Sequence, residues 1–314
     1  MTTPRARELG IQGLGWFVRR FVEPATEVEP FYAAALRLQA LRPRPPGTRS
    51  LMLWAGDLTM VELNVLNAAP DSEARRDEMS LVMRTASCGS ALRHLQASGA
   101  AALSRDHGPT RTATFVDPFG RLVGVQATDG DAGVCGDGVR PGQVASREAV
   151  APAAVPASAQ VPGASAPTAE FLDVYGIDVA VEDPVALAEF YRDLLGLEPL
   201  IPITRAGAQL SLGRRARLRL LPGGRRHPAP TDRDQVPDVW VLRVFDHAAL
   251  MSRLTSRGVP IVTVRRFTGG IIAYAVDPEG HLFGFQQRTP DLLRDGEVER
   301  VEDALANRLW ATGA

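Results

Sequence analysis

The feature that most constrains the fold is an internal repeat. Residues 11–128 and 171–288 form two blocks that match each other at an offset of 159–160 residues. The clearest matches pair Phe31-Tyr32 with Phe190-Tyr191, Asp117-Pro118-Phe119-Gly120 with Asp277-Pro278-Glu279-Gly280, and Gly124-Val125-Gln126 with Gly284-Phe285-Gln286. Solenoid repeats have periods of roughly 20–50 residues. A repeat of this length instead predicts a duplicated domain.

The rest of the chain lies outside these two blocks. A length of 314 residues allows about two domains. Residues 129–169, between the blocks, are rich in Ala, Pro, Gly, Val and Ser and contain no aromatic residue, which predicts a linker. Residues 1–10 are expected to form an N-terminal arm. In the tail, 289–314, Val298, Val301, Leu305 and Leu309 follow a helical spacing, so a short terminal helix is expected.

Within each block the pattern predicts two β-α-β units. In the second block an apolar strand over 174–181 precedes Asp183-Pro184, an N-cap followed by proline at the first helical position. Gly196 is expected to end that helix. Strands are predicted near 208–213, 216–221 and 239–245, a helix capped by Asp246 follows, and Asp277-Pro-Glu-Gly is a type I turn of a closing hairpin. The first block repeats this order, with helices near 25–38 and 88–98.

At this point the sequence resembles a known family. The segments VYGIDVAVEDPVALAEFYRDLLGLEPL and YAVDPEGHLFGFQQ are similar to the vicinal oxygen chelate superfamily, which includes glyoxalase I, bleomycin and fosfomycin resistance proteins and extradiol dioxygenases. The segments GLGWFV, FYAAALRL, MVELN and VDPFGRLVGVQ carry a looser resemblance in the first block. The resemblance implies an α+β fold of tandem domains, each made of two βαβββ modules that form a half-open barrel around one concave site.

The resemblance also implies four inward-facing positions that hold a divalent metal in this superfamily. In the second block these positions fall on Gly176, Arg219, Val239 and Gly284, and in the first block on Trp16, Glu62, about Ser80 and Gly124. Only Glu62 keeps a ligand type, whereas a catalytic cation normally has about three protein ligands. The five histidines are scattered along the chain. We therefore expect no metal and no other cofactor in either domain.

The alternation of strand side chains predicts what else the concave sites contain. In the second block Arg217 and Arg219 share one face of a strand, and Arg243 faces them from another, an arrangement that could hold a carboxylate, phosphate or sulfonate. In the alternative, this arginine-rich hairpin is merely exposed. Gln286, on the last strand, could hydrogen-bond a ligand carbonyl.

In the first block the same alternation predicts an apolar, aromatic-walled cavity. Trp16, Met60 and Glu62 point inward, together with Gln126 from the last strand. A carboxylate beside apolar walls can act as a general acid or base, so Glu62 is the candidate catalytic residue. In the alternative, Glu62 simply pairs with one of the many arginines.

Composition excludes several classes of function. All 35 residues in the Lys+Arg count are arginine, which excludes Schiff-base, pyridoxal-phosphate and Walker-A chemistry and indicates a gene of high GC content, as in a high-GC bacterium. The net charge of -1 argues against nucleic-acid binding. No apolar run reaches the roughly 18 residues that a bilayer span needs, and no signal segment is evident, so a cytoplasmic monomer or homodimer is expected. Cys88 and Cys135 offer neither a disulfide framework nor a cysteine zinc site.

Two classes of function remain after these exclusions. The first is a glyoxalase/bleomycin-resistance-like protein that binds a small organic molecule without a metal, in a resistance, sequestration or secondary-metabolite role. The second is an enzyme of the lyase, isomerase or dioxygenase type. It would use Glu62 as acid or base with an arginine-held anionic substrate, or a metal through ligands placed elsewhere.

Overall fold

The computed structural model describes most of both repeated blocks. It covers residues 11–127, with gaps at 22, 24, 41–49, 56–58, 67–77 and 104–111, and residues 171–288, with gaps at 214–215 and 268–269. The predicted arm (1–10), linker (129–169) and helical tail (289–314) lie outside the described residues, so these three predictions stay predictions.

The described strands form two sheets, which we call sheet A and sheet B. Sheet A has the order β13-β14-β15-β12-β1-β4-β3-β2. Its strands are β1 (Ile11–Phe21), β2 (Gln39–Ala40), β3 (Ser50–Trp54), β4 (Met60–Val65), β12 (Asp238–Val244), β13 (Ile261–Phe267), β14 (Gly270–Val276) and β15 (Leu282–Arg288). Sheet B has the order β10-β11-β9-β5-β8-β7-β6. Its strands are β5 (Met79–Thr85), β6 (Ala101–Leu103), β7 (Thr112–Val116), β8 (Leu122–Ala127), β9 (Phe171–Val181), β10 (Ala208–Ser211) and β11 (Arg217–Pro222).

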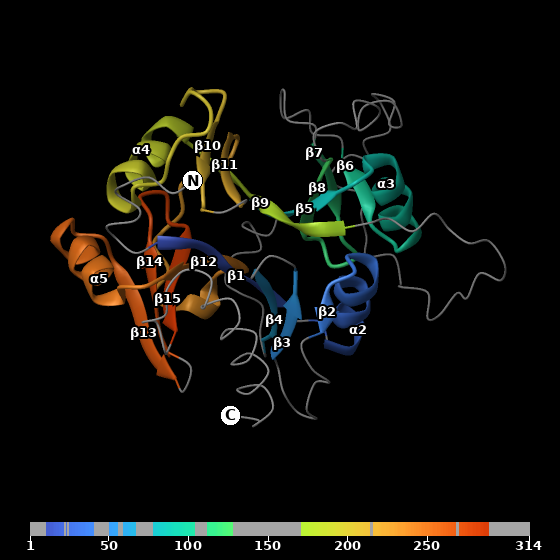
Figure 1. Ribbon diagram of the computed structural model, residues 1–314, viewed down its shortest axis with the longest axis horizontal. Coiled ribbons are helices and arrows are strands. Elements are labelled where there is room, and N and C mark those ends of the chain that lie inside the picture. The colour runs from blue at the N-terminus through green and yellow to red at the C-terminus, as the bar shows by residue number, and fades with distance from the viewer. Residues whose placement is uncertain are drawn as a thin grey trace.

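Each sheet combines strands from both sequence blocks. In the centre of sheet A, β1 of the first block pairs antiparallel with β12 of the second, and in sheet B β5 pairs antiparallel with β9 (Figure 1). The predicted α+β architecture of paired modules in open sheets is therefore confirmed. The expectation that each half-open barrel forms within one block is wrong, because the central strand pairs join the two blocks.

The helices begin and end largely where the sequence predicts. Helix α4 (Pro184–Leu195) is capped by Asp183, whose side chain accepts hydrogen bonds from the backbone N–H groups of Val185 and Ala186. It ends at Gly196, where a φ of 69° suits glycine. Helix α5 (His247–Ser256) is capped by Asp246, and α3 (Cys88–Ala97) by Ser87.

The first-block helix predicted near 25–38 is divided into two parts. An α-helix, α2 (Ala25–Pro30), passes into a π-helical turn, η1 (Phe31–Ala35). Pro30 has no backbone N–H and cannot make the i→i−4 hydrogen bond, so the regular ladder changes at this point. The equivalent helix α4 has its proline at the first turn, where no such bond is lost.

The helices cover one face of each sheet. Helices α2 and α5 contact β4 and β15 of sheet A, and α3 and α4 contact strands of sheet B. Tyr191 of α4 also packs edge-on against Trp240 and Phe283 of sheet A, with ring centroids 5.4 and 5.7 Å apart. Leu218 and Leu220 of β11 are fully buried in this core. The opposite faces of the two sheets are called inner face A and inner face B below.

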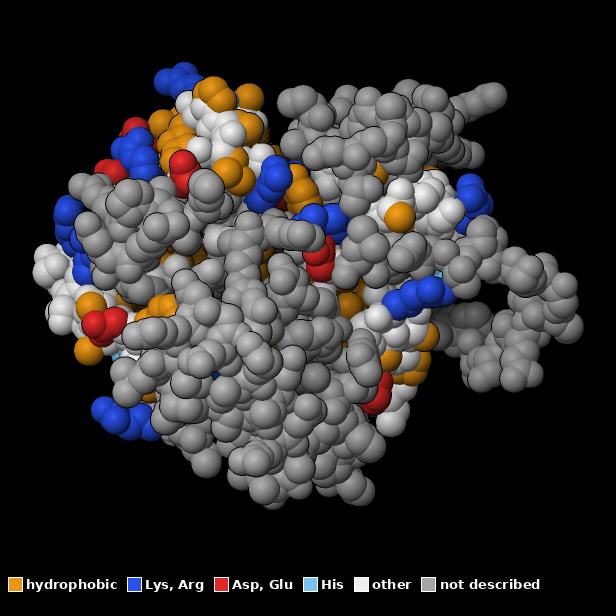
Figure 2. All heavy atoms as spheres, in the orientation of Figure 1, with side chains coloured by type: hydrophobic (Ala, Val, Ile, Leu, Met, Phe, Trp, Pro, Cys, Tyr) orange, Lys and Arg blue, Asp and Glu red, His pale blue; other side chains and the backbone are white. Residues whose placement is uncertain are grey.

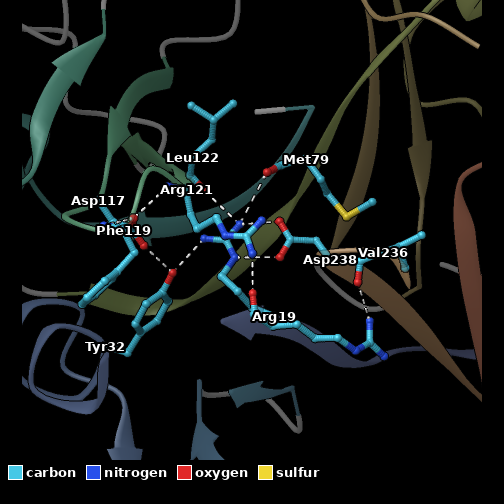
Figure 3. A network of polar contacts seen from close by, with 10 residues as sticks. Arg19, Tyr32, Met79, Asp117, Phe119, Arg121, Leu122, Val236 and Asp238 are labelled. Carbon is cyan, nitrogen blue, oxygen red and sulfur yellow. Dashed lines mark hydrogen bonds and ion pairs between the residues drawn. The ribbon is translucent and has the colours of Figure 1, made fainter. Parts of the chain in front are cut away.

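A buried polar network ties the two sheets together (Figure 3). Arg19 of β1 donates through Nε and Nη2 to the Asp238 carboxylate of β12, at 3.0 Å each, and through Nη1 to the Tyr32 hydroxyl at 2.9 Å. Its Nη2 also reaches the backbone carbonyls of Met79 and Leu122 in sheet B. Burial opposes the charge of Arg19, but Asp238 more than offsets this effect, so the pKa of Arg19 is raised. The ion pair joins two strands of sheet A, and the Arg19 Nη2 bonds to the two carbonyls link sheet A to sheet B.

The same network continues into the first-block turn. The Tyr32 hydroxyl donates to Asp117 Oδ2 at 2.7 Å, and Asp117 Oδ1 accepts from the backbone N–H groups of Phe119 and Arg121. Burial raises the pKa values of Tyr32 and Asp117. The second block contains the equivalent turn, in which the Tyr191 hydroxyl donates to Asp277 at 2.7 Å.

Two further observations bear on the predicted partners. Among the described residues, no helix combines the length and apolar character that crossing a bilayer requires. On the face shown in Figure 2, the arginine side chains of described residues lie scattered among acidic and apolar ones.

Candidate functional site

Inner face A is built from alternate residues of six strands, β1, β3, β4, β12, β14 and β15. Strand pairing sets Trp16 beside Val241 and Met60, Val18 beside Val239 and Glu62, and Arg243 beside Gln286. Because side chains alternate across a strand, residues two positions apart share this face. Its described members are Trp16, Val18, Arg20, Met52, Met60, Glu62, Val239, Val241, Arg243, Ile272, Tyr274, Gly284, Gln286 and Arg288.

The middle of inner face A is apolar. Val18, Val239, Val241 and Tyr274 are buried and belong to one hydrophobic cluster, separate from the core beneath the helices, and Trp16 packs against it. A Cβ on Gly284 would lie 3.0 Å from Val241 and 3.2 Å from the Tyr274 ring. Together these side chains form what we call the apolar floor of inner face A.

At one end of this floor, which we call the Trp16 end, positive charges gather. The Arg288 guanidinium lies 5.4 Å from the centre of the Trp16 ring, a cation–π arrangement, and its Nη2 is 3.7 Å from Met60 Sδ. Arg243 and Gln286 are cross-strand neighbours and are almost fully buried.

At the other end, the Arg20 end, charges of both signs meet. Arg20 is fully buried, donates to the Val236 carbonyl at 3.0 Å, and places Nε 3.2 Å from Asp234 of the short helix η3 (Arg233–Gln235). Burial lowers the pKa of Arg20 and Asp234 opposes this change. Burial, followed by the charge of Glu62, raises the pKa of Tyr274, so its hydroxyl stays protonated. Glu62 accepts a hydrogen bond from Ser50 Oγ at 3.0 Å.

Three buried N–H groups on inner face A have no acceptor within the described protein. They are Trp16 Nε1, Arg20 Nη2 and Gln286 Nε2. Leaving a buried donor unsatisfied costs about 1–3 kcal/mol, and the large majority of buried polar side-chain atoms in proteins have a partner. Three such donors around one apolar floor therefore indicate a surface arranged to receive acceptor atoms from a ligand.

Inner face B has the same layout with a different chemistry. Arg219 Nε donates to Asp178 Oδ1 at 2.6 Å, and Arg84 Nε lies 2.9 Å from Asp173 Oδ1. The hydroxyl of Thr112 donates to Gln126 Oε1 at 2.5 Å. These charged and amide side chains of inner face B are thus paired with one another, whereas the buried hydroxyls of Ser80 and Thr114 on the same face have no partner within the described protein.

An aromatic ring fits between two arginines on inner face B. Tyr175 occupies the bulge where β9 pairs with β5, and its ring lies 4.9 Å from the Arg217 guanidinium carbon and 5.9 Å from that of Arg84. Gln209 Nε2 donates to the Tyr175 hydroxyl at 3.4 Å. The Tyr175 side chain is therefore held by contacts with Arg217, Arg84 and Gln209 of the same face.

The structure regroups the predicted site residues. Trp16, Met60 and Glu62 lie on inner face A as a set, but the expected inclusion of Gln126 is wrong, because β8 belongs to sheet B. Arg217 and Arg219 share inner face B, whereas Arg243 and Gln286 lie on inner face A beside Trp16. The expectation that Arg243 faces Arg217 and Arg219 is wrong for the same reason, since the modules pair between blocks.

Sequence reasoning missed three residues of inner face A. Arg20 shares the alternation of Trp16 and Val18, and Arg288 shares that of Gly284 and Gln286, so extending the same period by one step would have found both. Tyr274 of β14 could have been found in the same way from its pairing opposite Gly284. Asp173 and Asp178, which neutralise the arginines of inner face B, required the strand pairing to be known.

The four positions that hold a metal in the resembling family do not fit a metal here. On inner face A they are Trp16, Glu62, Val239 and Gly284, and on inner face B they are Ser80, Gly124, Gly176 and Arg219. Only one of the eight is a carboxylate, and the described residues contain no group of three or more His, Cys, Asp or Glu placed to hold a metal ion. The eight side chains therefore do not supply the set of about three ligands that a catalytic cation needs.

Solved structures share this arrangement of elements. A protein from Bacillus subtilis, provisionally assigned as a dioxygenase, superimposes with a TM-score of 0.59 at 15% identity, over 95% of this chain and 90% of that one. Glyoxalase I from Zea mays superimposes with a TM-score of 0.58 at 14% identity, over 92% of this chain and 95% of the maize protein. No family model matches the sequence, and no curated protein matches it significantly.

These likenesses extend over nearly the whole chain, and they agree with the paired βαβββ units, the helix caps and the hairpin turns described above. At this level of identity they define the architecture and leave the chemistry to the residues themselves. The chain has the fold of these two proteins, with its modules present as a tandem duplication.

Proposed function

We propose that the protein binds a small organic molecule on inner face A without a metal. The observation that carries the proposal is the set of unpartnered buried donors, Trp16 Nε1, Arg20 Nη2 and Gln286 Nε2, around an apolar floor. A mostly apolar surface with a few convergent polar groups is the usual composition of a small-molecule site. A ligand with suitable acceptors removes the cost of the three unpaired donors when it binds.

Inner face B is the weaker candidate for this role. Arg219 already pairs with Asp178, and Arg84 with Asp173. The Tyr175 ring lies against Arg217. A ligand would have to replace these contacts before it gained new ones. The predicted anion site at Arg217 and Arg219 is therefore not part of our proposal.

The biological setting that we propose follows from this chemistry. A protein that binds a small molecule without turnover serves resistance, sequestration or secondary metabolism, by analogy with the drug-binding members of the family that the sequence resembles. A cytoplasmic location and a monomeric or homodimeric state remain predictions from the sequence.

The proposal is tested by dye binding to chelator-treated protein. We expect 8-anilinonaphthalene-1-sulfonate or its uncharged parent, N-phenyl-1-naphthylamine, to bind with a stoichiometry of one per chain. Gln286→Leu should weaken that binding about 2–10-fold, because it removes one hydrogen-bond donor. The matched variant Gln126→Leu, at the equivalent position of inner face B, should leave dye affinity unchanged.

Two results would contradict this function. One is the failure of both dyes to bind, or binding that Gln126→Leu alone weakens. The other is one tightly bound divalent metal per chain, found by elemental analysis of the purified protein, which would show that ligands outside the described residues complete a metal centre.

A second candidate function is metal-independent acid/base catalysis by Glu62. It is favoured by the position of Glu62 on the same face as the donors, near the protonated Tyr274 hydroxyl and the Arg20 guanidinium. Glu62→Gln separates the two functions. A binding protein keeps its ligand affinity after this change, whereas an enzyme that abstracts a proton with Glu62 loses turnover.

A further inference from the structure

The Arg20 end of inner face A places a buried donor next to an acceptor that a ligand can reach. Val18 of β1 is the cross-strand neighbour of Glu62 on β4, and Arg20 follows Val18 by two residues on the same face. Glu62 and Arg20 are therefore diagonal neighbours with long side chains. Arg20 is fully buried, whereas Glu62 is half-buried, so the carboxylate lies at the open side of the pair.

Each of these two side chains has a polar atom without a protein partner. Arg20 Nη1 donates to the Val236 carbonyl and Nε lies 3.2 Å from Asp234, but Nη2 has no acceptor within the described protein. Glu62 Oε1 accepts from Ser50, and no hydrogen bond to Oε2 forms among the described residues. An unused cationic N–H donor and an unused carboxylate oxygen therefore occupy adjacent positions of one face.

Tyr274 closes the same end from the opposite side of the sheet. It lies across from Gly284, and a Cβ on that glycine would be 3.2 Å from the tyrosine ring, so the ring occupies space that a side chain at 284 would need. Burial and then the charge of Glu62 raise the pKa of Tyr274, and Arg233 and Arg20 oppose these effects. The carboxylate and the guanidinium of the pair are thus both within electrostatic range of the tyrosine hydroxyl.

The charges at this end balance, which decides the kind of group that can bind. Asp234 lies 3.2 Å from Arg20 and 3.4 Å from Arg233, and Glu62 is the second acid beside these two bases. A carboxylate placed here would meet Glu62, and an ammonium group would meet Arg20, so neither charge is favoured. A hydroxyl group both donates and accepts a hydrogen bond. It can therefore use the free atoms of both side chains at once.

The equivalent positions of inner face B do not carry this pair. On β11 the position of Glu62 is taken by Arg219, and on β9 the position of Arg20 is taken by Ala180. A guanidinium has no acceptor atom and a methyl group has no donor. A hydroxyl placed at these positions of inner face B would find neither of the two partners that inner face A offers.

We propose that the small molecule bound on inner face A is an apolar alcohol or phenol, whose hydroxyl donates to Glu62 Oε2 and accepts from Arg20 Nη2. Its apolar body lies on the neighbouring Val18 and Val239 of the apolar floor. The inference rests on the function proposed above and adds the chemical class of the ligand and its orientation. Binding is non-covalent and needs no co-reactant.

The ligand class is tested on the wild-type protein with 2-naphthol and its methyl ether, 2-methoxynaphthalene. The ether keeps the ring system and an accepting oxygen, but it has no O–H to donate. We expect equilibrium dialysis to show that 2-naphthol binds about tenfold or more tightly than the ether, because hydrogen bonds to ionised groups are the stronger ones. 2-Naphthoate, whose charge would face Glu62, should bind more weakly than 2-naphthol.

Variants of Glu62 test the location. Glu62→Met removes the acceptor and should abolish most of the preference for 2-naphthol, while the affinity for the ether stays within about twofold. Glu62→Gln keeps an accepting oxygen and should keep the affinity for 2-naphthol within about threefold. The control Thr114→Val removes a buried hydroxyl from inner face B and should leave both affinities unchanged. Circular dichroism and retained binding of the ether establish that Glu62→Met is folded.

The outcomes separate this inference from the proposed function. If 2-naphthol and its ether bind equally, as they would if water met Glu62 and Arg20 instead, the hydroxyl inference is overturned and the binding function stands. The same holds if 2-naphthoate binds more tightly than 2-naphthol, if Glu62→Met keeps the preference, or if Thr114→Val abolishes it. If the naphthalene compounds fail to bind while the two dyes do, the inference is again overturned. If the dyes fail as well, the binding function itself fails.

Discussion

Inner faces A and B occupy equivalent positions in the duplicated fold, yet equivalent strand positions differ in whether a charged side chain has a charged neighbour. On inner face B, Asp178 and Arg219 sit side by side and form a buried ion pair. The equivalent neighbours on inner face A are Val18 and Glu62. Where B has a charged pair within the protein, A has one carboxylate next to an apolar side chain.

This difference shows how a duplicated domain can divide its roles. Charged side chains that pair within the protein make the face rigid, and a ligand must replace these pairs before it can bind to them. A face with unpaired donors carries a cost in the free protein and recovers it on binding. The unpartnered buried atoms also differ in kind between the faces: N–H donors of Trp16, Arg20 and Gln286 on inner face A, and the hydroxyls of Ser80 and Thr114 on inner face B.

The largest expected effect concerns the buried network of Arg19, which links sheet A to sheet B. Arg19 and Asp238 pair across β1 and β12, and the equivalent pair across β9 and β5 is Val179 with Met79. Asp238→Met should therefore reduce the free energy of unfolding by about 3–5 kcal/mol, because it leaves Arg19 buried without its carboxylate. Urea denaturation followed by circular dichroism measures this loss.

The double variant Arg19→Val with Asp238→Met copies the other half of the molecule. We expect it to recover at least half of the lost stability, because an apolar pair of suitable volume can replace a buried ion pair. If the single variant Asp238→Met loses less than about 1 kcal/mol of unfolding free energy, the Arg19 network does not hold the two sheets together.

Local signals in the sequence were sufficient for most of the fold. The Asp183-Pro184 helix start, Gly196 at the helix end and the Asp277 turn each depend on neighbouring residues, and the structure shows all three. The helix predicted over 25–38 is not continuous, because Pro30 interrupts the regular helical hydrogen bonds. Alternation along the strands also placed Trp16, Met60 and Glu62 on one face correctly.

The grouping of residues into sites could not be obtained from the same signals. Alternation decides which face of a strand a side chain occupies, but not which strand pairs with which. Because β1 pairs with β12 and β5 with β9, Arg243 lies on the same face as Trp16, and Gln126 on the same face as Arg217. The ion pairs of inner face B, such as Arg84 with Asp173, depend on the same long-range pairing.

A second, smaller effect compares the carboxylates of the two inner faces. Asp178→Asn should lower the free energy of unfolding by about 2 kcal/mol, because it removes a charge-assisted bond to a buried Arg219. Glu62→Gln should cost less than about 1 kcal/mol, because Glu62 is half-buried and bonds to the neutral Ser50 hydroxyl. Urea unfolding of the two variants at one pH gives the comparison, and equal losses would contradict the assignment of inner face B as the internally paired face.

The smallest expected effect compares the two hairpin turns through their pH dependence. His281 stands where the first block has Arg121, and its Nδ1 lies 3.1 Å from Asp277 Oδ2. Burial disfavours the charged imidazole, but Asp277, with Glu78 and Glu279 nearby, more than offsets this, so the pKa of His281 is raised above its ordinary 6.5. Its stabilising contribution is therefore complete below about pH 6.5 and is lost as the pH rises through the folded-state value.

His281→Gln should accordingly be less stable than the wild type at pH 5.5, and the difference should shrink as the pH rises above 6.5. The control is His247→Gln, since burial lowers the pKa of His247 and its contribution has the opposite slope. Urea midpoints measured from pH 5 to 9 give both curves. A stability difference for His281→Gln that grew with pH would mean that the imidazole is neutral in the folded protein. Asp277 would then be held by the backbone N–H groups and the Tyr191 hydroxyl without a charged partner at His281.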